Sequence, residues 1–360
     1  MRLVEPYEFK YQLYIKKRWI GKKLLEVLES EFHINSKEYY INSIKEGKIL
    51  INEKLTSEDY ILKDNDFLTH LTIRKENPII FKKIEIIFED NDYLVVDKPS
   101  SWPVHICGAY NFNTLQRILM DEYNYKDIKI LHRLDKQTSG IVIFAKNGNS
   151  AEFFRNKLHS DNIQKIYFAR VKGDFNTIYN NKEMINSNGR IICKKYLKPL
   201  DKSRGIHTDV DDKEVENFLN NKNDDINDNE KEKFDPKYAE TEFEFLFYNS
   251  ESNTSVVKCY PKTGRTHQIR IHLRCLGFPI ANDPCYGGII FNDLKEFENP
   301  ELKEYQYNSH TNNNKDIFSV SELFCYKIWL HAWSYKFDKY EFKTKEPDWA
   351  GKNYKIEHKF

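Results

Sequence analysis

The chain has 360 residues, 40% of them hydrophobic and 14% aromatic, which is enough for one large domain plus a small one. The formal net charge is only +1, so any RNA-binding surface must come from local segregation of charge. The six cysteines form no C-x-x-C pair, which argues against a zinc knuckle and favours a reducing compartment. No apolar run reaches the ~20 residues that a membrane span needs.

Residues 1–75 predict a small α/β unit. Apolar residues recur at helical spacing over 20–32, and Ser36 can cap a second helix that Gly47 ends. The run 48–51 has the length and composition of a strand. Two of the basic residues in this region are candidates for RNA contact, against a solvated face as the alternative: Lys22 and Lys23.

Residues 76–173 carry short apolar runs at 94–96, 141–145 and 165–171, which predict buried strands. The stretch 174–236 is rich in Asn, Asp, Lys and Glu, and its segment 211–233 has a local charge of −5, which leaves +6 on the rest of the chain. We expect this stretch to be a polar surface insertion, disordered in its later half.

Order is expected to resume at residue 237. Thr241, Phe243, Phe245 and Phe247 alternate with glutamates, which predicts a half-buried strand with these four side chains on one face. The Asn-rich stretch 307–315 predicts a further surface loop.

The run at 132–140 reads His-Arg-Leu-Asp-Lys-Gln-Thr-Ser-Gly and directly precedes a predicted strand. Loops held by rigid strands often carry binding and catalytic residues. Asp135 is therefore a candidate nucleophile or base, and Arg133 a candidate partner for a phosphate or a base edge. From spacing alone a structural interpretation is favoured, in which Asp135 caps the following turn and Arg133 is solvated.

The run 263–274 predicts a helix that Thr266 caps and Gly277 ends. Three residues then share a cationic face: His267, Arg270 and Arg274. Arginines on one stripe repel each other unless an anion lies opposite, which favours a phosphate, an acidic partner such as Asp135, or both. An exposed basic face is the alternative.

Tyr167 lies in the predicted strand 165–171, where a tyrosine is normally part of the core. His132, His267 and His272 have no carboxylate or cysteine beside them at ligand spacing, so no metal site is expected.

Together these runs resemble the signature blocks of the RluA-type pseudouridine synthases. His-Arg-Leu-Asp-x-x-Thr-Ser-Gly is present at 132–140, and Lys-x-Tyr-x-Ala-x-Val-x-Gly at 165–173. Thr-Gly-Arg-Thr-His-Gln-Ile-Arg-Ile-His is present at 263–272, and Leu-His-Ala at 330–332. Residues 5–75 resemble the N-terminal region of the eukaryotic Rib2/Pus9-like tRNA branch, which is similar to an S4-type RNA-binding unit.

The resemblance implies isomerisation of uridine to pseudouridine within RNA, without a cofactor, nucleotide or metal. Asp135 is then the catalytic carboxylate, acting by covalent attack or by removal of a ribose proton. Arg270 pairs with it, with Arg265 the less favoured partner. Tyr167 packs on the uracil, and Arg133 fills the gap that the flipped uridine leaves. The remaining expected RNA contacts are His132, Arg265, His267, Arg274, Lys22 and Lys23.

The implied fold is α+β, with a mixed, mostly antiparallel sheet flanked by helices. The implied organisation is an S4-like unit at 1–75 and a catalytic domain at 76–350, interrupted by the polar insertion at about 174–236. We expect a monomer in the cytoplasm, with the nucleus or an organelle as alternatives.

The expected partner is tRNA, at position 32 of the anticodon loop, because flipping a base costs least in a loop. Ribosomal or messenger RNA is an alternative target. Two rival functions stay open on the residues alone. One is an RNA-binding protein without catalytic activity, and the other is a hydrolase that uses His132 and Asp135.

Overall fold

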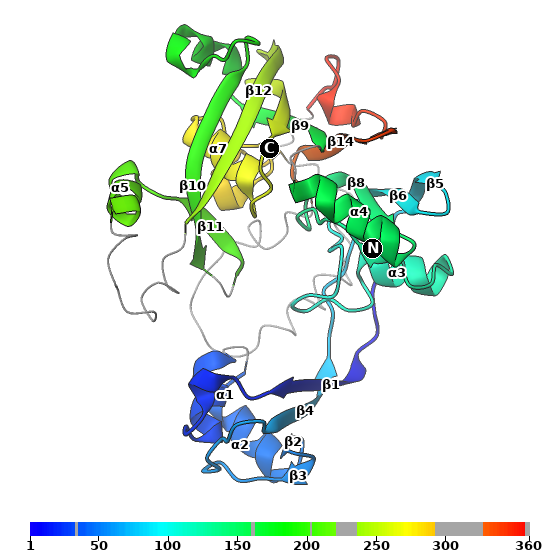
Figure 1. Ribbon diagram of the computed structural model, residues 1–360, viewed down its shortest axis with the longest axis vertical. Coiled ribbons are helices and arrows are strands. Elements are labelled where there is room, and N and C mark those ends of the chain that lie inside the picture. The colour runs from blue at the N-terminus through cyan, green and yellow to red at the C-terminus, as the bar shows by residue number, and fades with distance from the viewer. Residues whose placement is uncertain (33–34, 160–162, 202–203, 221–235, 292–326, 357–360) are drawn as a thin grey trace. The chain divides into compact units, whose positions relative to one another are not determined.

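The computed structural model of the protein describes residues 1–32, 35–159, 163–201, 204–220, 236–291 and 327–356. The chain folds as two compact units (Figure 1). The smaller comprises Leu3–Pro78 with Gly108–Tyr110, and the larger comprises Met1–Arg2, Ile79–Cys107 and the chain from Asn111 onward. Each unit has its own sheet, and each is described separately below.

The smaller unit is a four-stranded sheet, in the order β1-β4-β2-β3, with two helices. All of its strand pairs are antiparallel. Its elements are β1 (Tyr7–Tyr14), α1 (Leu24–Glu31), α2 (Lys37–Lys45), β2 (Ile49–Ile51), β3 (Lys54–Leu55) and β4 (Phe67–Arg74).

The second predicted helix of this unit is confirmed together with its signals. The Ser36 side chain accepts a hydrogen bond from the Tyr39 backbone N–H, which satisfies one of the donors that a helix start leaves unpaired. Gly47, with φ of 68°, follows the last turn in the left-handed conformation that favours glycine. In the first predicted stretch, Leu24 and Leu28 are buried on α1, whereas Ile20 precedes that helix and is exposed.

The larger unit is built on an eleven-stranded sheet. Its main path runs in the order β11-β10-β12-β13-β9-β14-β8-β6-β5, with β15 beside β14 and β7 beside β8. The strands are β5 (Glu85–Glu89), β6 (Tyr93–Lys98), β7 (Lys129–Ile130), β8 (Ser139–Ala145), β9 (Gln164–Lys172), β10 (Ile191–Asp201), β11 (Ile206–Asp209), β12 (Lys237–Asn249), β13 (Thr254–Pro261), β14 (Leu330–Phe337) and β15 (Tyr340–Lys343).

Helices flank this sheet. They are α3 (Leu115–Glu122), α4 (Gly148–His159), α5 (Asp212–Asn220) and α7 (Gln268–Cys275). Helix α7 packs against β10, β11 and β12, and α4 packs against β8. The pair of β8 with β14 is parallel and the other pairs are antiparallel, so the predicted mixed, mostly antiparallel α+β fold is confirmed.

Gly140 makes the parallel contact between β8 and β14 possible. It pairs with Ala332, and a Cβ atom on Gly140 would lie 2.3 Å from the Ala332 carbonyl oxygen. Its φ of 114° is also a conformation that other residues rarely adopt. The glycine that ends the first signature block therefore fixes the junction on which that block sits.

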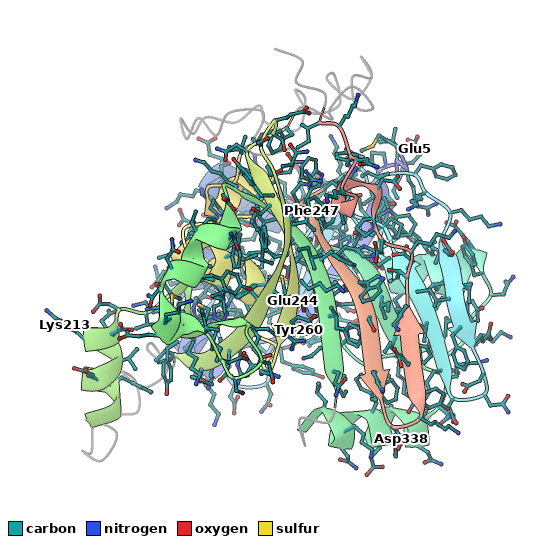
Figure 2. All side chains as sticks on the ribbon, turned by 90° about the horizontal axis from the view of Figure 1, so that it is seen from above. Glu5, Lys213, Glu244, Phe247, Tyr260 and Asp338 are labelled. Atoms are coloured by element: carbon teal, nitrogen blue, oxygen red, sulfur yellow. The ribbon has the colours of Figure 1, made fainter. Side chains whose placement is uncertain are left out.

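The predicted alternation in β12 is confirmed at Thr241 and Phe243, which are fully buried, and breaks down beyond them. The register against β13 shifts between Phe245 and Phe247, so Phe247 is half-buried instead of sharing the buried face. A bulge of this kind adds one residue and turns the following side chains. Figure 2 labels Glu244 and Phe247, which lie on either side of this register shift.

The polar stretch 174–236 differs from its prediction. Strands β10 and β11, at 191–209, form one end of the main sheet instead of a surface insertion, because Ile191, Cys193 and Leu197 are buried on β10 opposite β12. Helix α5 follows at 212–220. Residues 221–235, where disorder was predicted, and the predicted loop at 307–315 lie outside the described residues.

Candidate active site

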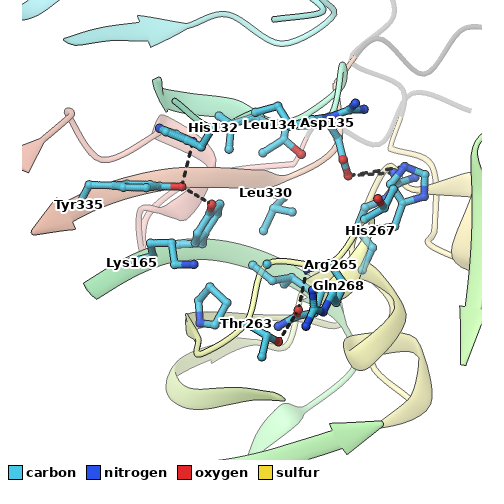
Figure 3. A pocket seen from close by; sticks show the side chains of 18 of the residues that line it. His132, Leu134, Asp135, Lys165, Thr263, Arg265, His267, Gln268, Leu330 and Tyr335 are labelled. Carbon is cyan, nitrogen blue, oxygen red and sulfur yellow. Dashed lines mark hydrogen bonds and ion pairs between the residues drawn. The ribbon is translucent and has the colours of Figure 1, made fainter. Parts of the chain in front are cut away.

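A cavity of about 320 Å³ opens beside the sheet of the larger unit. The first and third signature blocks lie on opposite sides of it, and Lys165 and Tyr167 of the second block also line it (Figure 3). The lining residues come from 131–135 with Thr138, from Phe154, Leu158, Lys165 and Tyr167, from Pro261 with 263–270, and from Leu330 with Tyr335. Four of these segments follow or lie on strands, namely β7, β9, β13 and β14, which gives the side chains a rigid frame.

Asp135 and Arg270 form the predicted ion pair. The Arg270 Nη1 atom donates to Asp135 Oδ2 at 3.2 Å. The other edge of the guanidinium donates to Asp283, with Nε to Oδ2 at 2.7 Å and Nη2 to Oδ1 at 2.9 Å. Arg270 thus bridges two carboxylates and is only 4% exposed, so the alternative of an exposed basic helix face is wrong for this residue. Its planar fork fixes both partners in orientation.

The net effect of these surroundings keeps Asp135 ionised. Burial by itself raises the pKa of this carboxyl, but the neighbouring His267 and Arg270 lower it, and its pKa lies below the ordinary value. Burial also lowers the pKa of His267 to about 4, so His267 is neutral at neutral pH. The charge that stabilises the Asp135 carboxylate under those conditions is therefore that of Arg270.

The start of α7 departs from its prediction. The helix begins at Gln268 instead of using Thr266 as a cap. His267 precedes it in the left-handed conformation, with φ of 56°, and its side chain makes no capping hydrogen bond. Such a conformation in a non-glycine residue costs on the order of 1–3 kcal/mol and is concentrated at functional sites. Gly277 follows the helix with φ of 86°, as predicted.

Tyr167 lines the cavity, and a short chain of hydrogen bonds orients its hydroxyl. His132 Nε2 accepts from the Ile143 backbone N–H at 3.2 Å, so the neutral ring carries its hydrogen on Nδ1 and donates to the Tyr335 hydroxyl at 3.4 Å. Tyr335 can then donate to Tyr167, whose hydroxyl lies 2.8 Å away. The hydrogen of the Tyr167 hydroxyl is therefore available to another acceptor.

These aromatic groups are neutral. Burial raises the pKa of Tyr167 to about 12 and that of Tyr335 well above its ordinary value, and it lowers the pKa of His132 to about 3. The rings of His132 and Tyr335 stack with centroids 4.6 Å apart. His132, which is predicted to contact RNA, is half-buried in the cavity lining and supports the tyrosine pair.

Of the other predicted RNA contacts, Arg133 and Arg265 are exposed and line the cavity. Arg265 also donates from Nε to the Tyr238 carbonyl oxygen at 3.0 Å. Arg274 lies beyond the cavity lining and pairs with Asp209 on β11. Two further residues belong to the smaller unit and do not line the cavity: Lys22 and Lys23.

Three residues of the site were not predicted. Asp283 and Tyr286 lie in the segment Asn-Asp-Pro-Cys-Tyr-Gly-Gly at 282–288, whose two glycines were a signal for a tight turn. Gly288 donates its backbone N–H to the Asp283 carbonyl at 2.8 Å, which holds that turn. Tyr335 lies three residues beyond the Leu-His-Ala block on β14, whose burial pattern has no simple alternation that could have marked it.

Lys98 anchors the loop that carries Asp135. Its side chain is fully buried, and Nζ donates to the carbonyl oxygens of Pro99, Trp102 and Lys136 at 2.9, 2.8 and 3.2 Å. Burial lowers its pKa to about 7. Since Lys136 directly follows Asp135, the hydrogen bond from Lys98 to the Lys136 carbonyl oxygen fixes the turn that carries the Asp135 carboxylate.

Within the described ranges, no group of three or more His, Cys, Asp or Glu residues is placed to hold a metal ion. In the same residues, no helix has both the length and the apolar character to cross a membrane. The larger unit thus brings an ionised carboxylate to a cavity with exposed arginines on its edge, which makes this cavity the candidate active site.

Comparison with known proteins leads to the family. The family model described as RNA pseudouridylate synthase matches residues 92–274, just over half of the chain. The chain therefore belongs to the RNA pseudouridylate synthase family.

Three curated relatives illustrate this membership. Pseudouridylate synthase RPUSD2 of Homo sapiens is 37% identical over 80% of this chain and 47% of its own length. The mitochondrial tRNA pseudouridine(32) synthase of Saccharomyces cerevisiae is 30% identical over 97% of this chain and 77% of its own length. RNA pseudouridine synthase 7 of Arabidopsis thaliana is 32% identical over 97% and 86%, respectively. The chain spans about half the length of the human and mouse RPUSD2 proteins.

Proposed function

We propose that this protein isomerises uridine to pseudouridine in RNA, with Asp135 as the catalytic carboxylate. One observation carries the proposal. Asp135 lies at the cavity, 18% exposed, and the buried Arg270 guanidinium keeps it charged, as a nucleophile or base at neutral pH must be. The family membership supports the type of reaction.

In the proposed reaction the N1–C1′ bond breaks, the uracil turns, and a C5–C1′ bond forms. C5 then loses its proton and N1 gains one, so the product is an isomer of the substrate and no electrons are transferred. Asp135 either attacks C1′ or removes the proton on C2′. Tyr167 packs on the uracil and its hydroxyl helps to exchange the C5 proton, and Arg133 occupies the place that the flipped uridine leaves.

We propose tRNA as the substrate, with position 32 of the anticodon loop as the favoured site. Two relatives support this choice by their names, tRNA pseudouridine(32) synthase and tRNA pseudouridine(31) synthase, both from Saccharomyces cerevisiae. Ribosomal and messenger RNA are the alternatives that a transcriptome-wide measurement separates.

Residues 1–75 are proposed to be an S4-like RNA-binding unit, and residues 76–350 the catalytic domain. Lys22 and Lys23 are exposed there, and Lys23 pairs only with the exposed Asp59 among the described residues, so these side chains can turn to phosphates at little cost. We further propose a monomer that acts in the cytoplasm, with an organelle as the alternative because one relative is named mitochondrial.

The test is to incubate the protein with unmodified RNA, including tRNA transcripts, and to map new pseudouridines at base resolution. Intact mass is unsuitable because the product is an isomer. Asp135→Asn should abolish product, a loss of at least about 10³-fold, and should spare RNA affinity. Binding without product from the unsubstituted protein would favour a silent RNA-binding protein, and free uracil or cleaved RNA would favour a hydrolase.

A further inference from the structure

Hydrogen bonding fixes the imidazole of His267 in one tautomer. The Tyr286 hydroxyl donates its single hydrogen to the His207 carbonyl oxygen at 2.9 Å. The same hydroxyl lies 2.8 Å from His267 Nδ1, and it also accepts from the His207 backbone N–H at 3.4 Å. Because one hydroxyl hydrogen cannot serve two acceptors, His267 Nδ1 carries the hydrogen and donates to Tyr286.

The remaining ring nitrogen of His267 therefore presents a lone pair. Nε2 lies 3.8 Å from Asp135 Oδ2, and both residues line the cavity (Figure 3). Two acceptors that face each other across a cavity repel unless a donor approaches one of them. The pair is thus arranged for a substrate that brings a hydroxyl or an N–H group to Nε2.

The backbone of His267 adopts an unfavourable conformation, so the orientation of its ring is maintained at a cost in free energy. His267 adopts a left-handed conformation although its side chain caps nothing on α7. Tyr286, which holds the ring, is 3% exposed and packs under the Arg270 guanidinium, with 4.8 Å between its ring centroid and the guanidinium carbon. The half-buried His267 ring is held by buried neighbours, so the protein and not the solvent fixes its orientation.

We propose that His267 Nε2 accepts a hydrogen bond from the ribose 2′-hydroxyl of the target uridine. This proposal rests on the proposed function and adds the group that reads the sugar. In ribose, O2′ is attached to C2′, next to C1′. A hydrogen bond of about 2.8 Å to Nε2 and an approach of about 3–3.5 Å between Asp135 and C1′ or the C2′ hydrogen are therefore compatible with the 3.8 Å separation.

The contact would have two consequences. It would distinguish RNA from DNA at the reacting nucleotide, because only ribose carries the donor. It would also increase electron density at O2′ when the bond from N1 to C1′ weakens, so that positive charge at C1′ develops more easily. The effect should therefore appear in the rate of the chemical step as well as in binding.

The experiment is a cycle of two enzymes and two substrates. A short synthetic RNA that contains the mapped target site is made with uridine or with 2′-deoxyuridine at the target, and single-turnover rates are measured at saturating enzyme. His267→Asn is the informative variant, because asparagine tolerates the left-handed backbone and can still donate to Tyr286 but lacks an acceptor at Nε2.

Any intrinsic change in reactivity of the deoxy substrate is common to both enzymes and cancels in the cycle. The unsubstituted enzyme should prefer the ribose substrate by about 10-fold more than His267→Asn does, the value of one well-formed hydrogen bond in a buried site. Equal preference ratios for the two enzymes would overturn the proposal.

Two further variants complete the test. Tyr286→Phe keeps the ring under Arg270 but frees the His267 hydrogen to move to Nε2, so this variant should lose the ribose preference as well. Arg265→Gln, at the exposed edge of the cavity, should weaken RNA binding and leave the preference ratio unchanged. If neither the unsubstituted enzyme nor any variant forms pseudouridine, the proposed function fails. Dissociation constants for each enzyme with the ribose and the deoxyribose RNA then decide whether the ribose contact exists.

Discussion

The two walls of the cavity stabilise their buried polar groups differently: one by pairing charges and the other by hydrogen bonds between neutral groups. The charged wall consists of Asp135 and Arg270, and Asp283, which is buried outside the cavity lining, shares the same guanidinium. On the neutral wall, made of His132, Tyr167 and Tyr335, three uncharged groups form one line of hydrogen bonds. The charged wall depends on Coulomb attraction at low dielectric, and the neutral wall depends on every donor finding an acceptor.

This difference separates stability from activity on the charged wall. Asp283 is 1% exposed and makes both short bonds to Arg270, whereas Asp135 makes one longer bond and reaches the cavity. Asp283 therefore neutralises the buried positive charge of Arg270, whereas Asp135 depends on that charge to stay ionised. Asp283 is thus a structural partner of Arg270, which in turn pairs with Asp135.

The largest expected effect is on Asp283. Asp283→Asn leaves the buried guanidinium without its main partner, and we expect the free energy of unfolding to fall by about 3–5 kcal/mol. Asp135→Asn, the matched control on the same guanidinium, should lower it by less than about 1 kcal/mol although it abolishes product. Chemical denaturation measures both, and equal losses would contradict the division of roles.

The next effect concerns the neutral wall. Tyr167→Phe should slow product formation by about 10²–10⁴-fold, as loss of a group at the reacting base does. Tyr335→Phe, which only removes the orienting donor, should slow it by about 10-fold. In stability, the double variant should lose less than the sum of the single losses, because it leaves no buried hydroxyl unpaired. Strict additivity would show that the two hydroxyls are independent.

Lys98, beneath the charged wall, predicts a pH dependence of stability. Its folded pKa of about 7 lies below the value of 10.5 expected in the unfolded chain. Between these values the unfolded chain binds more protons, so the free energy of unfolding should rise with pH, by about 2 kcal/mol from pH 7 to pH 9. Lys98→Met should remove this rise in denaturation curves recorded across the window. An unchanged slope would assign it to other groups.

The smallest effect is expected at Arg274, on the same helix as Arg270. Its pair with Asp209 is about one-third exposed on both sides, and solvent screens such a pair. Arg274→Gln should therefore change the free energy of unfolding by less than about 1 kcal/mol. A loss comparable to that of Asp283→Asn would mean that burial does not separate the two arginines of α7.

The sequence was most informative where one residue type performs one local task. Ser36 and Gly47 mark the ends of a helix because capping and positive φ depend on neighbouring backbone. The specific pair of Asp135 and Arg270 followed from the family resemblance, because the cationic stripe alone left a phosphate and an exposed basic face open as alternatives.

Asp283 and Tyr335 could not be found in this way. Their roles depend on which segments the sheet brings together, and nothing local distinguishes them from other turn or strand residues. The polar composition of 174–220 was misleading for a related reason. Strand β10 buries Ile191, Cys193 and Leu197, although exposed or half-buried lysines lie between and beside them.

The position of β14 in the sheet has a consequence for how the protein is made. It lies between β9 and β8, and these strands are joined in the sheet only through it. β14 is also separated from β9 by more than 150 residues of chain. During synthesis the two halves of the cavity can form early. Tyr335 and the parallel contact of β14 with β8 at Gly140 are added only after residues 330–337 leave the ribosome. Closure of a loop this long is a slow, late step. A nascent chain that lacks this strand therefore has an incomplete cavity.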